Sequence, residues 1–334
     1  MKKLINDPLQ VVDETISGIL KAYPHHLRMV EDNPRALVRV DAPVKGKVGL
    51  CTGGGSGHIP VFLGYVGPGL LDGVAVGNVF SSPSADAMFA ATKEIDGGAG
   101  VLYLYGNYGG DKMNFEMAAE MAEMENITVK HSIAADDVAS APRGEKERRR
   151  GVAGIFFAYK IAGAKADTMA GLDEVKKTVD RVIENTCTLG VALTPCTIPA
   201  VGKPNFEIAD DEMEVGMGIH GEKGIERTKL KKADEVATIM ANRVINDLPF
   251  KQGDEVAVLI NGLGGTPPEE LYILNSKISD ILSGSNIKVF RTYIGEYATS
   301  MEMAGASLSL LRLDDEMKQL LLAPAYSPFL LQWK

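Results

Sequence analysis

The sequence predicts an α/β protein, with an N-terminal doubly wound α/β domain followed by a C-terminal α+β domain. In the first half of the chain, short apolar runs that end in glycine-rich segments alternate with helical patterns, as in a parallel sheet that is covered on both faces. Near Asn185 the pattern changes to short β-like runs separated by prolines. A length of 334 residues also favours two domains over one. We therefore expect domains at residues 1–184 and 185–334.

The elements of the first domain follow from hydrophobic periodicity and from turn residues. Apolar residues recur at helical spacing from Val11 to Tyr23, and Pro24 ends this predicted helix. A serine followed by a proline, Ser82-Pro83, signals the start of a later helix. In chain order, the further elements that we expect are strand 48–50, strand 73–77, helix 85–95, strand 101–105, helix 113–125, strand 127–130, helix 151–166 and helix 172–183.

Three loops of this domain directly follow predicted strands, at residues 53–58, 80–84 and 106–111. Ligands of a doubly wound sheet bind outside the carboxyl ends of its strands. We therefore expect these loops to meet at the functional site.

The second domain mixes short strands with helices. We expect strands at 190–193, 214–221, 256–260, 288–293 and 307–311, and helices at 233–245 and 269–282.

The charge balance excludes two classes of partner. The net charge is −9 at pH 7, whereas nucleic acids and acidic membrane surfaces select basic proteins, so we expect neither as a partner. The one basic run, Arg148-Arg149-Arg150, adjoins Glu145 and Glu147 and is interpreted as a solvated loop.

The cysteines and the apolar runs indicate the compartment. The three cysteines cannot all pair, and none forms a C-x-x-C motif. The N-terminus lacks the apolar stretch of a signal peptide, and no apolar run approaches the roughly 20 residues that cross a bilayer. These features predict a cytoplasmic protein.

The first candidate for chemistry is the segment Gly53–His58, which reads GGGSGH. It fails the dinucleotide fingerprint G-x-G-x-x-G, which would need glycine at His58, and no phosphate-binding G-x-x-x-x-G-K-[ST] occurs anywhere in the chain. We therefore predict that this chain binds neither ATP nor NAD by itself. His58 can exchange a proton near neutral pH and is a candidate acid/base, and a purely structural turn is the alternative.

Two further side chains are candidates, each with a structural alternative. His220 is flanked by glycines that leave its imidazole uncovered, so it is either a nucleophile or a buried, hydrogen-bonded histidine. Asp111 either caps the helix that follows it or shares proton transfer with His58. The histidines show no metal-ligand spacing, so we expect no metal site.

Eight segments carry a family resemblance by their combination and order. They are Gly53–His58 (GGGSGH), Gly64–Gly67 (GYVG), Val79–Ser84 (VFSSPS), Gly110–Phe115 (GDKMNF), Arg150–Gly154 (RGVAG), Lys160–Gly163 (KIAG), Gly216–Glu222 (GMGIHGE) and Asn261–Gly265 (NGLGG). Together they resemble the dihydroxyacetone kinase family, and specifically its substrate-binding K subunit, over essentially the whole chain.

The resemblance implies phosphorylation of dihydroxyacetone or a similar small hydroxyketone. His220 would attack the ketone carbon and hold the substrate as a covalent hemiaminal, which glycerol cannot form. His58 and Asp111 would handle the proton of the terminal hydroxyl that receives the phosphate. The residues that would line the substrate are Gly55, Ser56, Gly57, Ser82 and Gly106.

The resemblance also implies partners. The chain is similar to the separate K subunit of a phosphotransferase-system enzyme, which forms a homodimer and docks an L subunit. That L subunit would carry ADP or ATP with Mg²⁺, and an M subunit would supply the phosphoryl group through it, so this chain would bind no cofactor of its own. Phosphoryl transfer consists mostly of positioning and charge stabilisation, so a chain that holds only the acceptor needs such a partner.

Departures from the family's usual pattern leave alternatives open. The segment from His58 to Phe62 reads HIPVF, where the family usually has HEPAH, and Gly106 stands where lysine is usual. A larger ketose such as erythrulose is therefore one alternative substrate. A second alternative is a non-catalytic paralogue that senses dihydroxyacetone and activates a transcription regulator. The presence of Asp111 together with His58 favours the kinase, because a sensor needs only capture.

Overall fold

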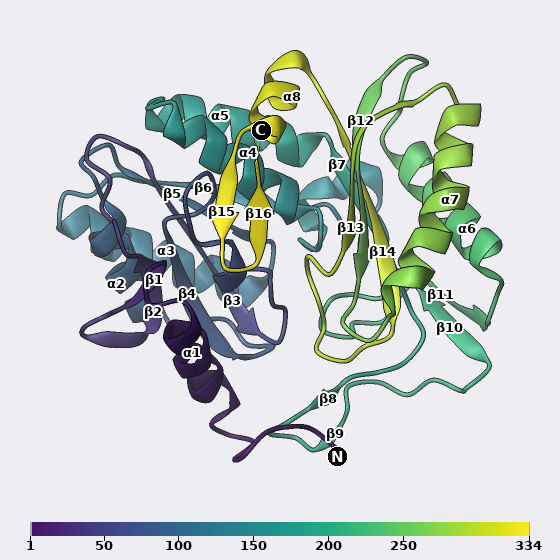
Figure 1. The fold of residues 1–334 in the computed structure, drawn as a ribbon, viewed down its shortest axis with the longest axis horizontal. Coiled ribbons are helices and arrows are strands. Elements are labelled where there is room, and N and C mark those ends of the chain that lie inside the picture. Colours follow the sequence, from purple (N-terminus) through teal and green to yellow (C-terminus); the bar gives the residue numbers. More distant parts are fainter. Residues whose placement is uncertain (1, 334) are drawn as a thin grey trace.

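The computed structural model describes residues 2–333 and contains two six-stranded sheets surrounded by helices (Figure 1). Strands up to Ala134 build one sheet, and strands from Thr186 onward build the other. Two helices, α4 (Ile155–Asp167) and α5 (Leu172–Glu184), connect them in the sequence. The predicted mixed α/β class is confirmed.

The first sheet has the strand order β1-β2-β4-β3-β5-β6. Its strands are β1 (Leu27–Val30), β2 (Asn33–Arg39), β3 (Gly49–Ser56), β4 (Gly73–Val79), β5 (Val101–Gly106) and β6 (Val129–Ala134). The strands from β3 to β6 are parallel, and the β1–β2 hairpin, which we did not predict, adds an antiparallel edge. The chain places β4 on one side of β3 and β5 on the other, so the loops after these strands diverge and leave a crevice at their carboxyl ends.

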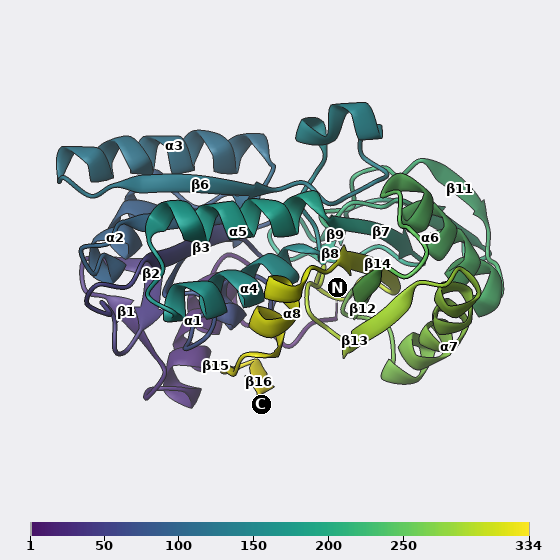
Figure 2. The ribbon, with the colours of Figure 1, turned by 90° about the horizontal axis from the view of Figure 1, so that it is seen from above.

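Helices cover both faces of this sheet. Helices α2 (Ala85–Ile95) and α3 (Gly109–Met124) pack on one face and α4 and α5 on the other, and Figure 2 shows α3 and α5 on opposite sides of β6. Helix α2 begins at Ala85, as predicted, and its cap is Ser84, whose side chain accepts a hydrogen bond from the Ala87 backbone at 3.3 Å; Ser82 of the predicted serine-proline signal is not the cap. The first helix, α1 (Val11–Ala22), also lies where periodicity predicted it.

The glycine segment is mostly a strand and not the predicted loop. Residues 53–56 complete β3, between β4 and β5. The glycines are required because other parts of the chain contact this backbone directly. A Cβ on Gly54 would overlap the Phe62 ring, and one on Gly55 would lie 2.6 Å from the Ser81 nitrogen. Only Gly57, with φ of +100°, uses the freedom of glycine to turn the chain.

The second sheet has the order β11-β10-β7-β14-β12-β13 and is antiparallel except for the β12–β13 pair. Its strands are β7 (Thr186–Ala192), β10 (Glu212–Val215), β11 (Glu226–Lys229), β12 (Glu255–Gly262), β13 (Lys288–Gly295) and β14 (Gly305–Arg312). Helices α6 (Ala233–Asp247) and α7 (Pro268–Gly284) pack against it, and a small hairpin joins β8 (Thr197–Ile198) to β9 (Lys203–Pro204).

The predicted strand over residues 214–221 is wrong beyond Val215. The chain leaves the sheet at Gly216, whose φ is +82°, and the following residues form a loop that holds His220. The alternating pattern was misleading because the glycines there serve close contacts with side chains instead of a strand.

The C-terminal tail returns to the first half of the molecule. Helix α8 (Asp315–Leu322) and the hairpin of β15 (Ala325–Ser327) and β16 (Leu330–Gln332), in yellow in Figure 1, lie beside α4. One apolar cluster contains Leu50 of β3, Phe156 of α4, Leu259 of β12 and Leu321 of α8. The two sheets therefore share a core through α4, and a domain boundary near residue 185 stays a prediction.

The arginine run is not the solvated loop that we predicted. Arg149 is fully buried and donates two hydrogen bonds to the Asp247 carboxylate, at 2.6 and 2.8 Å. Arg150 forms an ion pair with Asp137 at 2.7 Å, so only Arg148 of the three is largely exposed. Burial of these charges is possible because each meets a carboxylate, and the partners lie too far away in the sequence to be recognised there.

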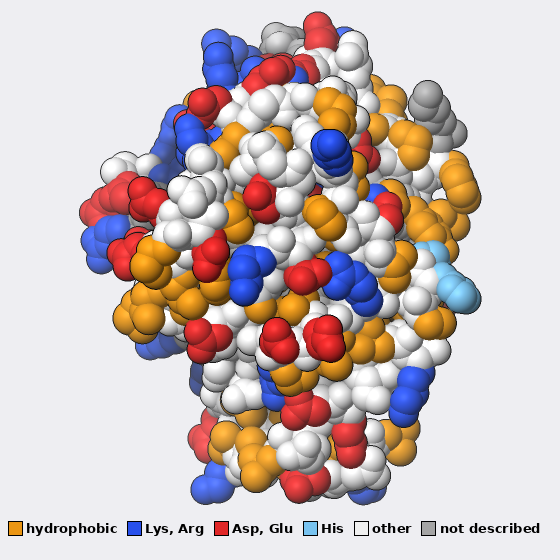
Figure 3. Space-filling view, turned by 90° about the vertical axis from the view of Figure 1, so that its left-hand side faces the viewer, with side chains coloured by type: hydrophobic (Ala, Val, Ile, Leu, Met, Phe, Trp, Pro, Cys, Tyr) orange, Lys and Arg blue, Asp and Glu red, His pale blue; other side chains and the backbone are white. Residues whose placement is uncertain are grey.

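The surface and the helix lengths complete the description. On the face drawn in Figure 3, acidic and basic side chains are interspersed among apolar ones. Within residues 2–333, no helix has the length and apolar character that crossing a membrane requires.

Candidate functional site

The structure brings the three candidate reactive side chains together at the carboxyl edge of the first sheet. His58 follows β3, Asp111 lies in the first turn of α3 after β5, and His220 reaches them from the loop between β10 and β11. The ring centroids of His58 and His220 are 4.9 Å apart. Asp111 is close enough for the charge of His220 to lower the pKa of its carboxyl group. The site thus combines residues from both sheets.

His58 is held as a neutral imidazole. Its ring is 1% exposed and stacks on Phe80 with centroids 4.9 Å apart. Its Nδ1 lies 2.7 Å from the Thr299 carbonyl oxygen, which can only accept, so Nδ1 carries the proton and Nε2 has the free lone pair. Burial, followed by the nearby His220, lowers the pKa of His58 to about 3. Nε2 is buried and has no hydrogen-bond partner within the described chain.

His220 is oriented by Glu222, two residues further along the chain. The His220 Nδ1 lies 2.8 Å from Glu222 Oε1, and the His220 backbone nitrogen donates to Oε2 at 2.9 Å. Burial opposes ionisation of Glu222, but these hydrogen bonds outweigh it and lower the pKa of the carboxyl group to about 2. A carboxylate accepts, so Nδ1 donates and the His220 Nε2 keeps its lone pair. The ring also contacts Phe80 and Tyr108 edge-on, with centroids 5.3 and 5.0 Å away.

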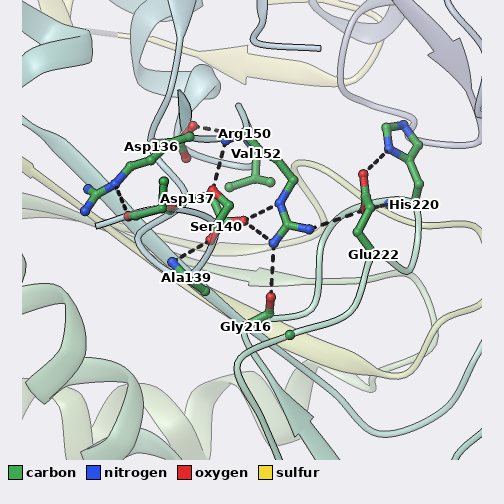
Figure 4. Close-up of polar contacts among 12 residues, drawn as sticks. Asp136, Asp137, Ala139, Ser140, Arg150, Val152, Gly216, His220 and Glu222 are labelled. Carbon is green, nitrogen blue, oxygen red and sulfur yellow. Dashed lines mark hydrogen bonds and ion pairs between the residues drawn. The ribbon is translucent and has the colours of Figure 1, made fainter. Parts of the chain in front are cut away.

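Arg150 links this pair to the second sheet (Figure 4). Its guanidinium group lies 2.7 Å from the Asp137 carboxylate and 3.9 Å from that of Glu222. The close approach needs Gly218, because a Cβ there would overlap the Glu222 carboxylate and lie 2.5 Å from the Arg150 guanidinium. A fixed positive charge behind Glu222 helps to keep it ionised and pointed at His220.

Asp111 does not cap helix α3, so the structural alternative considered for this residue is wrong. Helix α3 begins at Gly109 with Tyr108 as its N-cap residue, and no side chain caps it. Burial raises the pKa of the Asp111 carboxyl group to about 6, against the opposing hydrogen bond from Ser82 and the charge of His220. Its Oδ1 is buried without a hydrogen-bond partner in the part of the chain that the structure describes. Such a carboxyl group can take up and release a proton near neutral pH.

The five residues predicted to line the substrate lie in or directly after β3, β4 and β5. The Ser56 hydroxyl donates to the Gly77 carbonyl at 2.8 Å, so it already has an acceptor. Ser82 lies against Gly110, where a Cβ would be 2.7 Å from its hydroxyl. Gly106 ends β5, and a Cβ there would lie 3.1 Å from the Tyr108 ring. Contact of these residues with a substrate stays a prediction.

Sequence reasoning missed three contributors, which are Glu222, Tyr108 and Thr299. Glu222 had a recognisable signal, a carboxylate two residues after a glycine-flanked histidine. Thr299 had none, because it acts through a backbone carbonyl from a distant part of the chain.

Two of the departures from the family pattern lie on the far side of the glycine strand. An apolar cavity of about 220 Å³ lies between α1 and the ends of β3 and β4. Its lining includes Ile59, Phe62 and His58 but neither His220 nor Asp111. The cavity shares His58 with the other two candidates but contains neither of them, so we place the candidate site where His58, His220 and Asp111 meet. Among residues 2–333, no three or more His, Cys, Asp or Glu side chains gather as they would around a metal ion.

Comparison with known proteins identifies the family. Residues 17–329 match the model of the Dak1 domain. The dihydroxyacetone-binding subunit DhaK of a PTS-dependent dihydroxyacetone kinase from Listeria innocua is 43% identical, over 98% of this chain and 99% of its own length. This chain belongs to the dihydroxyacetone kinase family. The family and the enzyme class that the sequence predicted are confirmed.

Other relatives in the dihydroxyacetone kinase family bear on the alternatives. A D-erythrulose kinase from Mycolicibacterium smegmatis is 39% identical over 98% of this chain, which spans 56% of that protein. The dihydroxyacetone kinase of C. freundii in complex with AMP-PNP and Mg²⁺ superimposes with a TM-score of 0.89 at 30% identity, covering 99% of this chain and 61% of that one. A dihydroxyacetone kinase operon co-activator, Dha-DhaQ, superimposes with a TM-score of 0.88 at 30% identity, covering 94% of this chain and 96% of that one. Kinases and a co-activator share this fold, so the site chemistry must separate them.

Proposed function

We propose that this chain is the substrate-binding subunit of a phosphotransferase-system-dependent dihydroxyacetone kinase. One observation carries the proposal. The His220 Nε2 has a free lone pair and lies beside two buried acceptor atoms, His58 Nε2 and Asp111 Oδ1. Neither acceptor has a hydrogen-bond partner in the described chain. Buried polar atoms are normally paired, so these two acceptors point to a polar ligand. The DhaK subunit of Listeria innocua, similar over almost its whole length, supports the same function.

The first step is capture of the ketone on His220. The Nε2 lone pair forms a C–N bond to the ketone carbon, and the electron pair of the C=O bond moves to oxygen, which takes a proton from solvent. The ring releases its Nδ1 proton to solvent in exchange for the proton that the oxygen takes up, which leaves the ring neutral in the hemiaminal while Glu222 stays ionised. No atom leaves, so the subunit gains the mass of one intact ketose. Glycerol has no carbonyl carbon and cannot be captured.

The second step is activation of the terminal hydroxyl. With a pKa of about 6, Asp111 is mostly ionised at neutral pH and takes the hydroxyl proton while that oxygen attacks the phosphorus of the donor. With a pKa of about 3, His58 is too weak a base to hold that proton, so its Nε2 accepts a hydrogen bond and orients the substrate. The acid/base pair predicted from the sequence is thus divided into a base and an orienting group. Gly55, Ser56, Gly57, Ser82 and Gly106 line the acceptor.

The phosphoryl donor comes from other subunits. An L subunit holds ADP or ATP with Mg²⁺ over the site, an M subunit recharges it, and this chain acts as a homodimer. The lack of a phosphate-binding fingerprint in this sequence and the nucleotide complex of a related kinase support this division. We also propose a cytoplasmic location, since all three cysteines are free thiols.

Two other functions have specific support. The co-activator Dha-DhaQ matches this chain over nearly its full length, which keeps a sensor role as a second candidate. The erythrulose kinases among the relatives keep a four-carbon ketose as a second candidate substrate.

Mass spectrometry and reconstitution test the kinase proposal. Saturating dihydroxyacetone should add one ketose mass to the wild-type chain and none to His220→Ala. Asp111→Asn should keep the adduct yet lower turnover with the L and M subunits by roughly 10²–10⁴-fold, the range for an acid/base group.

Two other results of these experiments would favour the sensor or the four-carbon substrate. An adduct without any turnover in the reconstituted wild-type system would contradict the kinase and favour the sensor. A faster reaction with erythrulose than with dihydroxyacetone would change the substrate but not the reaction.

A further inference from the structure

A segment of the second half of the chain is paired with the backbone around His58. It follows β13 and precedes β14. The Met301 nitrogen donates to the Gly57 carbonyl at 2.8 Å, and the Thr299 nitrogen donates to the His58 carbonyl at 3.2 Å. The Thr299 hydroxyl adds a bond to the Ile59 carbonyl at 2.9 Å. These bonds place the Thr299 carbonyl oxygen against His58 Nδ1.

One buried asparagine holds the beginning of this segment. Asn261 lies near the carboxyl end of β12 and is fully buried. Its Oδ1 accepts hydrogen bonds from the Tyr297 and Ala298 nitrogens, both at 2.8 Å. Its Nδ2 donates to the Ala298 carbonyl at 2.8 Å and to the Ser307 hydroxyl at 3.1 Å. All the hydrogen-bonding capacity of the amide is used, and Ala298 is held on both its N–H and its C=O.

The consequence reaches His58 through a single residue. Ala298 directly precedes Thr299, so fixing its peptide groups fixes where Thr299 begins, and the Ser300 nitrogen, which donates to the Leu263 carbonyl at 2.8 Å, holds the next peptide group, which carries the Thr299 carbonyl. That carbonyl keeps the His58 proton on Nδ1 and leaves the lone pair on Nε2. Without it, the proton could move to Nε2, and His58 would present a donor where the substrate hydroxyl needs an acceptor.

We propose that Asn261 is a positioning residue that sets the tautomer of His58 through the Thr299 carbonyl. The inference rests on the proposed function for its effect on turnover, but the tautomer itself does not depend on any substrate. It also makes the two halves of the chain interdependent, because the second half both supplies His220 and sets the protonation pattern of His58.

The chemistry of the asparagine side chain is specific to this task. Aspartate would keep the two accepted bonds and lose both donors, and its charge would face the Ala298 carbonyl. Alanine would leave the Tyr297 and Ala298 N–H groups and the Ala298 carbonyl buried without these partners, which destabilises the segment. Gly264 supports the same segment, since a Cβ there would overlap the Met301 carbonyl.

Nitrogen NMR of the ¹⁵N-histidine-labelled full chain tests the proposal. The His58 signals are assigned by their loss in His58→Gln. In the wild type, Nδ1 should carry a proton and Nε2 should show the shift of an unprotonated nitrogen. Asn261→Ala should move part of the His58 population to the Nε2–H form. Asn261→Asp should give a smaller shift of the same kind.

A matched asparagine elsewhere serves as the control. Asn185 accepts two hydrogen bonds from the Arg312 guanidinium and donates to the Arg181 carbonyl, at the opposite end of the second sheet. Asn185→Ala should cost stability and leave the His58 tautomer unchanged. A tautomer that stays at Nδ1–H in Asn261→Ala overturns the proposal. If that variant does not fold, an unchanged tautomer in folded Asn261→Asp overturns it.

Kinetics separate this inference from the proposed function. With the L and M subunits, Asn261→Ala should keep ketose capture on His220 and lower turnover roughly 10- to 100-fold, as is typical when a supporting partner of a site residue is lost. A tautomer shift in a chain without kinase activity would retain the inference and reject the kinase. If Asn261→Ala had wild-type kinase activity and an unchanged His58 tautomer, the kinase proposal would stand and the role of Asn261 would be rejected.

Discussion

Three ionisable side chains at the site have different protonation states because their surroundings differ. His58 is buried against Phe80 and stays neutral, Glu222 accepts hydrogen bonds and stays ionised, and Asp111 has a carboxyl pKa raised to about 6. The spread of these values is the usual mark of a site that moves protons. Each state follows from burial and from one or two named neighbours.

The raised pKa of Asp111 predicts a pH-dependent cost in stability. A carboxyl group whose pKa is higher in the folded state stabilises the fold below about pH 4, and this contribution is lost as the pH rises through about 6. Asp111→Asn should therefore be more stable than the wild type at pH 8, by up to about 3 kcal/mol. Urea unfolding at pH 4, 6 and 8 measures the difference, which should shrink toward pH 4.

An exposed aspartate is the control for this prediction. Asp280→Asn, in α7, should change the free energy of unfolding little, and equally at each pH. If the stability difference between Asp111→Asn and the wild type did not change with pH, burial would not raise the pKa of the Asp111 carboxyl group.

At the scale of elements, the glycine strand determines the shape of the site. Strand β3 is nearly free of side chains from Gly53 to Gly55, so Phe62 and the Phe80–Ser81 turn pack directly on its backbone. These contacts bring Phe80 under the His58 ring. The glycine composition that suggested a loop in fact permits close packing around a strand.

Gly54→Ala should overpack this strand. The new methyl group would overlap the Phe62 ring, and insertion into a packed core costs about 1–3 kcal/mol. Adding Phe62→Leu to the same chain should recover part of that loss, because two residues in contact couple. Thermal unfolding of the single and double variants measures the recovery.

Gly18→Ala, in α1, is the matched control. Nothing lies within 4 Å of the new methyl group, and alanine favours a helix over glycine by about 1 kcal/mol. It should raise stability while Gly54→Ala lowers it. Additive effects of Gly54→Ala and Phe62→Leu would contradict the direct contact.

At the scale of the whole molecule, the two halves are joined by a common core. Helix α4 packs between strands of both sheets and α8, and the tail from Asp315 covers it. Lys160 of α4 donates to the Leu320 carbonyl at 2.9 Å, which ties the last helix to the first half. Because His58 and His220 come from different halves, this core also sets the distance between them.

Loss of one tail side chain should destabilise both halves together. Leu321 is fully buried in the shared core, so Leu321→Ala should cost about 2–5 kcal/mol. Unfolding should remain a single transition at a lower midpoint. Leu322→Ala, one residue away and 42% exposed, should cost less than about 0.5 kcal/mol. Two separate transitions in Leu321→Ala would show independent domains instead.

Much of the architecture could be predicted because it depends on local patterns. Helix α1, the start of α2 and strands β5 and β12 follow from periodicity and turn residues within a dozen positions. The course of residues 216–222 could not be predicted, because its glycines serve contacts with Arg150 and Glu222 that only the folded chain brings about. The burial of Arg149 depended in the same way on the distant Asp247.

By itself, the sequence determined the α/β class and the family, and it predicted three candidate reactive side chains at positions 58, 111 and 220. Those follow from residue types and spacings that are readable along the chain. Only the tertiary structure decided which nitrogen of each histidine is free and which carboxyl group has its pKa raised by burial. Tautomers and pKa values depend on partners such as the Thr299 carbonyl, which lies 241 positions from His58 and reaches it only after both sheets have packed on α4.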